Sequence, residues 1–279
     1  SFMFLGKDEI SEKSSRKIDL RGTFFYVLGL TMMVYGSSSI PNPLGWCLLL
    51  GGMVAIIVFW NLEKRSKSPV IDTKLFIRNR LFAFSNIAAL INYSATFAIV
   101  FLLSLFLQKV IGLSPRVAGT VLIAQPIMMA VFSPIAGRLS DSIQPRYLTS
   151  IGMTMCTLGL ASFGFISGET PLWLIVLLLV WVGLGFALFS SPNMNTIMSS
   201  VSKSQYGLAS GSAATMRVVG QIVSMTVATL FFAGMFGNQS VEMVSASLFQ
   251  KAVNWGFLTF AVISVAGIYF SYYRGKVSR

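Results

Sequence analysis

The 279 residues are 54% hydrophobic and only 11% charged, with a formal net charge of +12 and no histidine. Soluble domains have about a quarter charged residues, so this composition excludes an ordinary soluble protein. The basic excess does not predict nucleic-acid binding, because the basic residues lie between apolar segments. No metal or cofactor site is expected: histidine is missing, and Cys47 and Cys156 lie in separate apolar segments.

The apolar residues occur in long uninterrupted blocks. The stretch LWLIVLLLVWVGLGFALFS, from Leu172 to Ser190, contains nineteen residues without a charge. At 1.5 Å of rise per residue, a helix of this length matches the ~30 Å hydrocarbon thickness of a bilayer. We therefore predict an all-α integral membrane protein with about eight transmembrane helices.

The chain begins SFMFLGKDEI, without an initiator methionine, and FMFLG is typical of the end of a preceding span. We predict that residues 1–22 are a cytoplasmic segment after a missing span. Residues 23–62 are expected to form a two-helix hairpin with spans Thr23–Ile40 and Leu44–Leu62. The basic stretch EKRSKSPVIDTKLFIRNR, residues 63–80, is expected to be a cytoplasmic loop.

Residues 81–273 are predicted to form a bundle of six spans, followed by a cytoplasmic tail at 274–279. Proline, which cannot donate a backbone hydrogen bond, occurs at several of the joints. The six predicted spans are Leu81–Leu107, Val117–Ala136, Tyr147–Ile166, Leu172–Ser190, Ala209–Met235 and Val253–Tyr273.

Lysine and arginine collect on alternate connections between the spans. Only Lys109, Arg116 and Lys251 lie on one set of connections, and Arg217 lies inside a span. Because basic connections remain in the cytoplasm, both chain ends are predicted to be cytoplasmic in a multi-pass plasma-membrane protein. The other set holds seventeen basic residues: Lys7, Lys13, Arg16, Lys17, Arg21, Lys64, Arg65, Lys67, Lys74, Arg78, Arg80, Arg138, Arg146, Lys203, Arg274, Lys276 and Arg279.

The connection GRLSDSIQPR lies on the predicted cytoplasmic side. Gly137 allows a neighbouring helix end to approach closely. Asp141, one helical turn further, can accept hydrogen bonds at a helix N-terminus or pair with a basic residue. Arg138 and Arg146 add positive charge. The pattern favours a gating loop that latches two bundles together, and a short wettable turn that obeys the charge bias is the alternative.

Polar side chains occur at mid-depth in two predicted spans. Asn92 and Tyr93 lie in the first span of the bundle, and Gln125 lies in the second, just before Pro126. Polar groups inside a membrane usually face protein or a water-filled cavity. As a set, the three residues are interpreted as a polar cavity wall. Singly, each would also serve as an interhelical hydrogen bond worth about 0.6 kcal/mol.

Arg217 is the most informative charge. It lies roughly 12 Å inside its predicted span at 1.5 Å per residue, where insertion costs about 2.5–3.5 kcal/mol. No acidic residue lies in any predicted span. Arg217 therefore needs backbone carbonyls, water, an anionic substrate group or an acid from another part of the protein, unless it extends to the interface. A titratable group for proton coupling must likewise come from elsewhere.

Small residues mark the same span. GLASGSAAT begins at Gly207 and contains Gly211, and Gly220 follows. Small residues let helix backbones approach closely within membranes. We therefore predict that these glycines form a helix-packing surface, which a moving bundle would also require.

Several of these stretches resemble a known family. GRLSD matches the first half of the cytoplasmic loop motif of the major facilitator superfamily, in the copy found in the carboxy-terminal half. The chain departs from the motif at Ser142, Ile143, Gln144 and Pro145. FLLSLFLQKVIGLSPRVAG, from Phe101, and VGLGFALFSSPNMNTIMSSVSKSQYGLASGSAATMRVVGQIVSM, from Val182, resemble the fourteen-span drug:proton antiporter branch.

This resemblance implies a fold and a function. It implies that the last six spans form two inverted three-helix repeats, which rock against an amino-terminal six-span bundle of the same protein around a central site. It also implies a secondary transporter, most simply a proton-coupled efflux pump for small hydrophobic compounds, of which this chain is the carboxy-terminal portion.

Two other classes of function are considered. A membrane enzyme would need a nucleophile with its base, or metal ligands, at membrane depth, and the sequence offers neither. The alternative that remains open is a non-transporting membrane scaffold or sensor built on half of a transporter.

Overall fold

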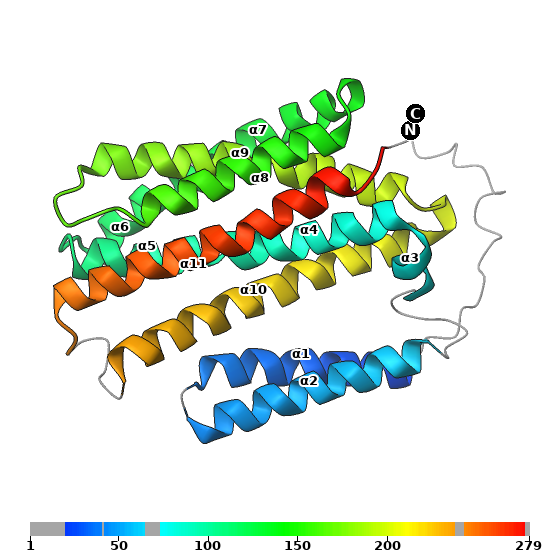
Figure 1. Ribbon diagram of the computed structural model, residues 1–279, viewed down its shortest axis with the longest axis horizontal. Coiled ribbons are helices and arrows are strands. Elements are labelled where there is room, and N and C mark those ends of the chain that lie inside the picture. The colour runs from blue at the N-terminus through cyan, green and yellow to red at the C-terminus, as the bar shows by residue number, and fades with distance from the viewer. Residues whose placement is uncertain (1–19, 41, 65–72, 238–242, 277–279) are drawn as a thin grey trace, which may run out of the picture.

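The computed structural model describes residues 20–40, 42–64, 73–237 and 243–276. Within these ranges every regular element is a helix, as Figure 1 shows, so the all-α prediction is confirmed. The predicted segment 1–22, the loop 63–80 and the tail 274–279 fall partly outside the described residues.

The leading hairpin consists of α1 (Leu20–Ser38) and α2 (Pro43–Glu63). Asn42 caps α2, because its side chain accepts a hydrogen bond from the backbone N–H of Leu44 at 3.2 Å. The hairpin lies along one side of the other helices (Figure 1) and reaches them through α10. There the hydroxyls of Tyr26 and Thr215 are 2.7 Å apart.

The remaining elements form the bundle. They are α3 (Thr73–Arg78), α4 (Arg80–Thr96), α5 (Ala98–Lys109), α6 (Pro115–Leu122), α7 (Ala124–Ser142), α8 (Pro145–Phe163), α9 (Leu172–Ser199), the short 3₁₀ helix η1 (Lys203–Gln205), α10 (Tyr206–Phe236) and α11 (Ala246–Tyr273).

Two predicted spans are interrupted. The first divides into α4 and α5 at Phe97, just after Ser94 and Thr96 donate side-chain hydrogen bonds to carbonyls four residues earlier. Such bonds compete with the backbone ladder and bend helices. The second divides into α6 and α7 at Ile123, where Pro126 has no N–H to donate to the carbonyl of the preceding turn.

Six helical segments are long and apolar enough to cross a membrane by length and composition: Pro43–Glu63, Arg80–Lys109, Pro115–Ser142, Leu172–Ser199, Lys203–Phe236 and Ala246–Tyr273. The other two predicted spans are present as α1 and α8. Each has 19 residues, enough for about 28 Å of helix, but both are rich in glycine, serine or threonine. Each of the two helices also contains one arginine, Arg21 in α1 and Arg146 in α8.

The helix ends gather at two opposite ends of the bundle (Figure 1). At one end, α2, α7, α9 and α11 finish and α4, α8 and α10 begin, and we call this the basic end. Its described basic residues outside the helix interiors are Arg21, Lys64, Arg78, Arg80, Arg138, Arg146, Lys203, Arg274 and Lys276, whereas Lys109, Arg116 and Lys251 lie at the other end.

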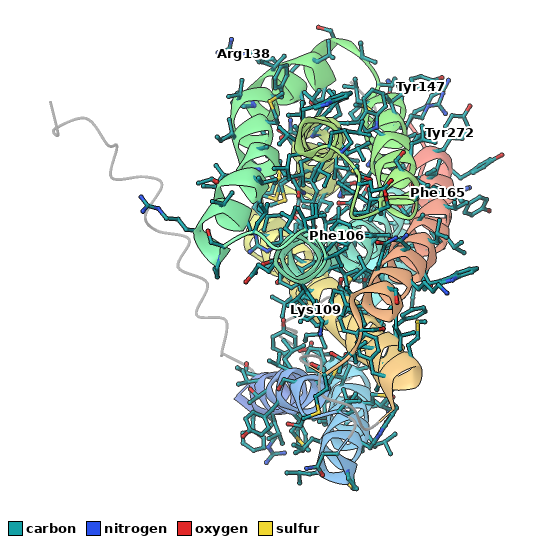
Figure 2. The ribbon with its side chains drawn as sticks, turned by 90° about the vertical axis from the view of Figure 1, so that its left-hand side faces the viewer. Phe106, Lys109, Arg138, Tyr147, Phe165 and Tyr272 are labelled. Atoms are coloured by element: carbon teal, nitrogen blue, oxygen red, sulfur yellow. The ribbon has the colours of Figure 1, made fainter. Side chains whose placement is uncertain are left out.

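Tyrosine side chains lie beside a basic residue at the basic end. Arg146 lies 4.6 Å from the ring of Tyr147 on α8 and 5.9 Å from the ring of Tyr272 on α11. Figure 2 shows Tyr147 and Tyr272 on the same outer side of the bundle. Tyrosines and arginines at one level are typical of a membrane–water interface.

The interior changes character along the bundle. Toward the end opposite the basic end, the core is apolar and includes the fully buried Phe106 of α5, Phe163 of α8 and Phe257 of α11. Toward the basic end, where Phe82 and Ile197 form a smaller apolar cluster, the interior also contains buried polar side chains. They are Ser85, Thr149, Asn193, Ser271 and Arg274.

Candidate functional site

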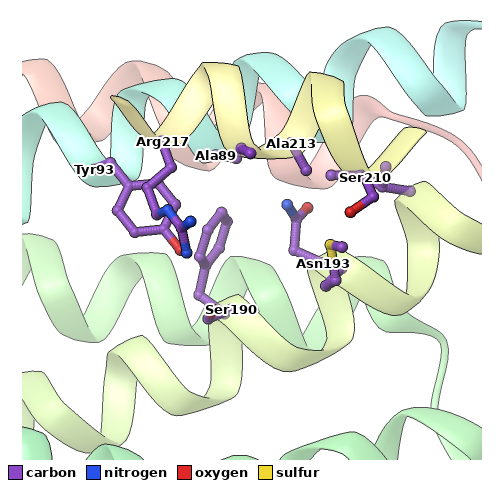
Figure 3. A pocket seen from close by; sticks show the side chains of 11 residues that line it. Ala89, Tyr93, Ser190, Asn193, Ser210, Ala213 and Arg217 are labelled. Atoms are coloured by element: carbon purple, nitrogen blue, oxygen red, sulfur yellow. The ribbon is translucent and has the colours of Figure 1, made fainter. Parts of the chain in front are cut away.

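A cavity of about 270 Å³ lies between α4, α9 and α10. Each helix contributes one face, because its lining residues recur at helical spacing. Figure 3 shows Arg217 and Tyr93 at one end of the cavity, Ser210 at the other and Asn193 between them. The full lining is Ala89 and Tyr93 of α4, Phe189, Ser190, Asn193, Met194 and Ile197 of α9, and Ser210, Ala213, Ala214 and Arg217 of α10.

Tyr93 is held at the cavity by packing on two sides. Its ring meets that of Phe186 edge to face, with 5.5 Å between the ring centroids. On the other side, Gly220 lets α10 approach so closely that an added Cβ would lie 2.8 Å from the Cβ of Tyr93. Gly220 therefore packs directly against α4.

Arg217 projects into the cavity. It lies about 16 Å along α10 from Tyr206, at 1.5 Å of rise per residue, and its side chain is exposed. In the described part of the chain no hydrogen bond or ion pair reaches its guanidinium. The described acids are Glu63, Asp141 and Glu169, all at helix ends or in a turn.

Asn193 connects the cavity to a buried network at the basic end. Its Nδ2 donates to the backbone carbonyl of Ser85 at 3.1 Å, and its Oδ1 accepts from Nη1 of Arg274 at 2.7 Å. Arg274 also donates from Nη2 to Oγ1 of Thr149 at 2.8 Å, which accepts a further bond from Ser271 at 2.7 Å. One arginine thus joins α4, α8, α9 and α11.

Arg274 is 1% exposed and lies just beyond the end of α11. Burial lowers the pKa of Arg274 to about 9, and no acid among the described residues opposes that shift. The guanidinium is therefore protonated at neutral pH, and neutral oxygens are the partners that the described residues provide. The sequence predicted that Arg274 belongs to the cytoplasmic tail, whereas the structure places its side chain inside the bundle.

The other polar residues predicted for the cavity lie elsewhere. Asn92 is fully buried on another face of α4, where its Nδ2 lies 3.0 Å from the sulfur of Met153 on α8. Gln125 is buried where α7 meets α9, since its backbone lies against Gly183. The structure thus brings Tyr93 and Arg217 together and separates Asn92 and Gln125 from them.

The loop predicted for gating lies where the end of α7 contacts α9. An added Cβ on Gly137 would lie 2.9 Å from Oγ of Ser191, so Gly137 permits close approach. Nearby, Asn195 of α9 donates to Oγ of Ser140 at 3.1 Å. Asp141 is exposed and lines a second cavity, of about 490 Å³, which also includes Tyr206 at the start of α10. Among the described residues, Asp141 has no hydrogen-bonding or ionic partner.

Among the described residues, neither arginine of this loop forms a hydrogen bond or ion pair with Asp141, and each has other surroundings. Arg138 is exposed at the outer edge of α7 (Figure 2). Arg146 donates to the hydroxyl of Tyr147 at 2.6 Å and lies against α11 through Tyr272. No ion pair within the loop is present among the residues that the structure describes.

Gly207 and Gly211 differ from Gly220. An added Cβ on either would meet no described atom within 4 Å. Their predicted role as a packing surface for another helix stays a prediction. A close backbone approach that the sequence did not predict joins α8 to α9, where a Cβ on Gly185 would lie 2.8 Å from the carbonyl oxygen of Gly152.

Sequence reasoning also missed Asn193 and Ser210 in the cavity wall. Both lie within a quoted stretch, VGLGFALFSSPNMNTIMSSVSKSQYGLASGSAAT, but no pattern set them apart from other membrane polar residues. The helical spacing of Asn193 from Phe189, and of Ser210 from Arg217, is the signal that could have placed them on cavity faces. For Arg274 no sequence signal distinguishes burial from a tail.

Within the described residues, no three His, Cys, Asp or Glu side chains are grouped in a way that could hold a metal ion. Cys47 is exposed on α2 and Cys156 is buried in α8, and both are free.

The helices, their apolar lengths and the open polar cavity define a multi-pass helical membrane protein. A model of the Major Facilitator Superfamily matches residues 22–225, most of the chain. The chain therefore belongs to the Major Facilitator Superfamily.

A relative named as a transporter and two named for drug resistance are similar to it. The riboflavin transporter RibZ of Clostridioides difficile is 30% identical over 236 residues, covering 84% of this chain and 50% of that protein. The multidrug resistance protein Stp of Mycobacterium tuberculosis is 28% identical over 229 residues, covering 79% and 42%. The tetracycline resistance determinant of Streptomyces rimosus is 30% identical over 199 residues, covering 70% and 56%. The chain spans about half the length of these relatives.

The fold is also similar to a solved transporter. The crystal structure of a bacterial homologue of the human lysosomal transporter Spinster, in an inward-facing and occupied conformation, matches with a TM-score of 0.54 and 14% identity. The match covers 91% of this chain and 64% of that one. At this identity the similarity concerns the fold alone.

Proposed function

We propose that this chain is the carboxy-terminal portion of a secondary active transporter that exports small hydrophobic compounds in exchange for protons. The observation that carries the proposal is the cavity between α4, α9 and α10. Its lining includes the exposed Ser210, Ala214 and Arg217, so a solute can enter it from the side of the bundle. Relatives named for multidrug and tetracycline resistance support export.

The partner of this surface is proposed to be an amino-terminal six-span bundle of the same protein. The chain spans about half the length of its relatives, which supports that arrangement, and the α1–α2 hairpin ahead of the bundle supports the proposed fourteen-span branch. Gly207 and Gly211 offer a smooth surface for such a bundle. The second cavity, with exposed Asp141 at its edge, is proposed as the seat of the latch.

The proposed orientation places the basic end in the cytoplasm of a plasma-membrane protein. The charge bias between the two ends supports it, because basic connections stay inside. The first cavity lies nearer that end and the apolar core fills the other. This arrangement fits a bundle loaded from the cytoplasm.

Proton coupling is proposed to depend on the rest of the protein. The described acids lie at helix ends or in a turn, and the buried one, Glu63, is the last residue of α2, so none lies in the middle of a span. An acid that couples transport to protons must be accessible in turn from the two faces of the membrane. We infer that such an acid belongs to the amino-terminal spans.

Dye efflux from proteoliposomes tests this proposal. The full-length protein is reconstituted with a fluorescent hydrophobic dye inside, and an inward pH gradient is imposed. We expect dye loss that stops when a protonophore collapses the gradient. Vesicles that contain only residues 1–279 are expected to show no pH-driven flux. Dye loss without any dependence on the gradient would contradict proton coupling.

The alternative is a membrane scaffold or sensor that does not transport. Asp141, which lines the second cavity and has no partner among the described residues, distinguishes the two proposals, because a latch is useful only if two bundles move. Full-length protein that binds dyes but moves none across vesicles would favour the alternative.

A further inference from the structure

We propose that the cavity between α4, α9 and α10 binds the anionic group of an amphiphilic ligand, with Arg217 as its charge partner. This inference rests on the proposed transport function and adds a substrate class to it: compact organic anions, such as aromatic carboxylates or phosphate esters. The hydrophobic compounds proposed above would then include a negatively charged end.

The first support is the state of Arg217. Its guanidinium enters the cavity beside Tyr93, and the described residues provide no acceptor for its donors. A guanidinium carries five N–H donors in a planar fork that fits carboxylate and phosphate oxygens. An arginine at this depth is costly unless something neutralises it, so an anionic ligand satisfies both the charge and the donors.

The second support is the charge behind the cavity wall. Asn193 lines the cavity, and its Oδ1 is bound at 2.7 Å by the buried Arg274. Arg274 has only neutral partners among the described residues. Two positive charges therefore act on the cavity, and that of Arg274 is buried, where charges interact more strongly than in water. Both favour an anion and disfavour a cation.

The third support is the division of the lining. Arg217, Tyr93 and Asn193 provide polar groups, whereas Phe189 and Ile197 provide an apolar wall. A volume of about 270 Å³ accommodates a ligand of one or two rings with one charged group. The geometry thus points to an amphiphile and not to a bare inorganic anion.

Anions and their matched neutral analogues test the assignment. Full-length protein in non-ionic detergent at pH 7 is titrated by calorimetry with benzoate, 2-naphthoate and phenyl phosphate, and with the neutral benzamide, 2-naphthamide and phenol. We expect at least one anion to bind about tenfold or more tighter than its neutral counterpart, the range of a charge-assisted hydrogen bond. The preference should weaken as salt concentration rises.

Variants assign the preference to Arg217. Arg217→Gln should abolish the difference between anion and neutral counterpart, and Arg217→Lys should keep part of it. Arg116→Gln removes the same charge from an exposed site at the opposite end of the bundle and should leave the preference intact. Size-exclusion profiles of all variants establish that each is folded.

A lipid headgroup has the same anionic chemistry as a soluble ligand. Repeating the titration in nanodiscs of phosphatidylcholine, with and without phosphatidylglycerol, separates the two sources. Competition by phosphatidylglycerol in the wild type but not in Arg217→Gln would identify the headgroup as the occupant of the same anion site. No competition would identify the soluble anion as the ligand.

Two results would overturn the inference. One is equal affinity for every acid and its neutral counterpart in the wild type, as expected if Arg217 pairs with an acid from another part of the protein. The other is an anion preference that survives in Arg217→Gln. If the same wild-type protein, reconstituted in vesicles, still exports neutral dyes, the transport proposal is retained and only the anion site is rejected.

Discussion

Two arginines illustrate how little a residue's place in the sequence says about its surroundings. Arg217 lies inside a span yet faces an open cavity without a partner among the described residues. Arg274 lies one residue beyond a span yet is buried against three helices other than its own. The sequence predicted the depth of Arg217 and missed the burial of Arg274, because neighbours from distant helices decide burial.

Removing Arg274 should loosen the basic end of the bundle. Arg274→Ala leaves oxygens of Asn193 and Thr149 without their donor, and the relief of the buried charge offsets only part of that loss. We expect destabilisation of about 2 kcal/mol, or roughly 5 °C in the melting temperature for a chain of this size. Thermal unfolding in detergent measures it.

The control for that experiment is Lys276→Ala, which removes an exposed charge two residues further on. Its melting temperature should equal that of the wild type. Arg274→Lys should recover part of the loss, since one ammonium cannot reach Asn193 and Thr149 together with the third acceptor, Oγ of Ser85 at 3.3 Å. Equal melting temperatures for Arg274→Ala and Lys276→Ala would disprove a structural role for the network.

For Asp141 we expect the opposite of Arg274: substitution should affect transport and not stability. Because it is exposed and makes no contact with a described partner, Asp141→Asn should leave the melting temperature unchanged. If it latches two bundles, the loss of its charge should reduce efflux by about tenfold, within the usual range of coupling between sites. Efflux assays on full-length protein decide this, and unchanged efflux would remove the latch.

Helix contacts depend on glycines that no motif identified. Gly152 of α8 and Gly185 of α9 bring two backbones into contact, and the apolar blocks around them predicted only that both segments are helical. Which glycines pack depends on helix rotation, and that in turn depends on all neighbouring helices at once. Gly207 and Gly211, which the sequence favoured, face open space in the described part of the chain.

A leucine at Gly185 should separate α8 from α9. Its Cβ alone would lie 2.8 Å from both the carbonyl oxygen of Gly152 and the Cβ of Met155. Overpacking of this kind costs about 1–3 kcal/mol, so Gly185→Leu should melt several degrees earlier. Gly234→Leu in α10 places the same side chain in open space and should be neutral or slightly stabilising. Similar melting curves for both variants would contradict the contact.

At the scale of the whole molecule, the two ends of the bundle differ in charge and in interior. Basic residues, tyrosines, the buried polar network and both cavities lie toward one end, and the apolar core lies toward the other. The sequence predicted the charge difference, because lysine and arginine residues collect on alternate connections between the spans. The position of the cavities follows from which helices meet, and no count of residues could provide it.

Cysteine labelling tests the proposed orientation. In a Cys47→Ser background, with Cys156 buried and unreactive, single cysteines are placed at the exposed Lys203 of the basic end and Glu169 of the opposite end. A membrane-impermeant maleimide added to intact cells should label Glu169→Cys and spare Lys203→Cys until the cells are lysed. The reverse pattern would invert the topology.

The sequence by itself determined that this is an all-helical membrane protein, where its apolar segments lie and which ends carry the positive charge. These properties depend on composition and local periodicity, since a bilayer requires about twenty apolar residues for each crossing. Only the tertiary structure decided that Tyr93 and Arg217 share a cavity, that Asn92 and Gln125 do not, and that Arg274 is buried. Hydropathy carries no information on helix rotation, and rotation decides which polar side chains meet.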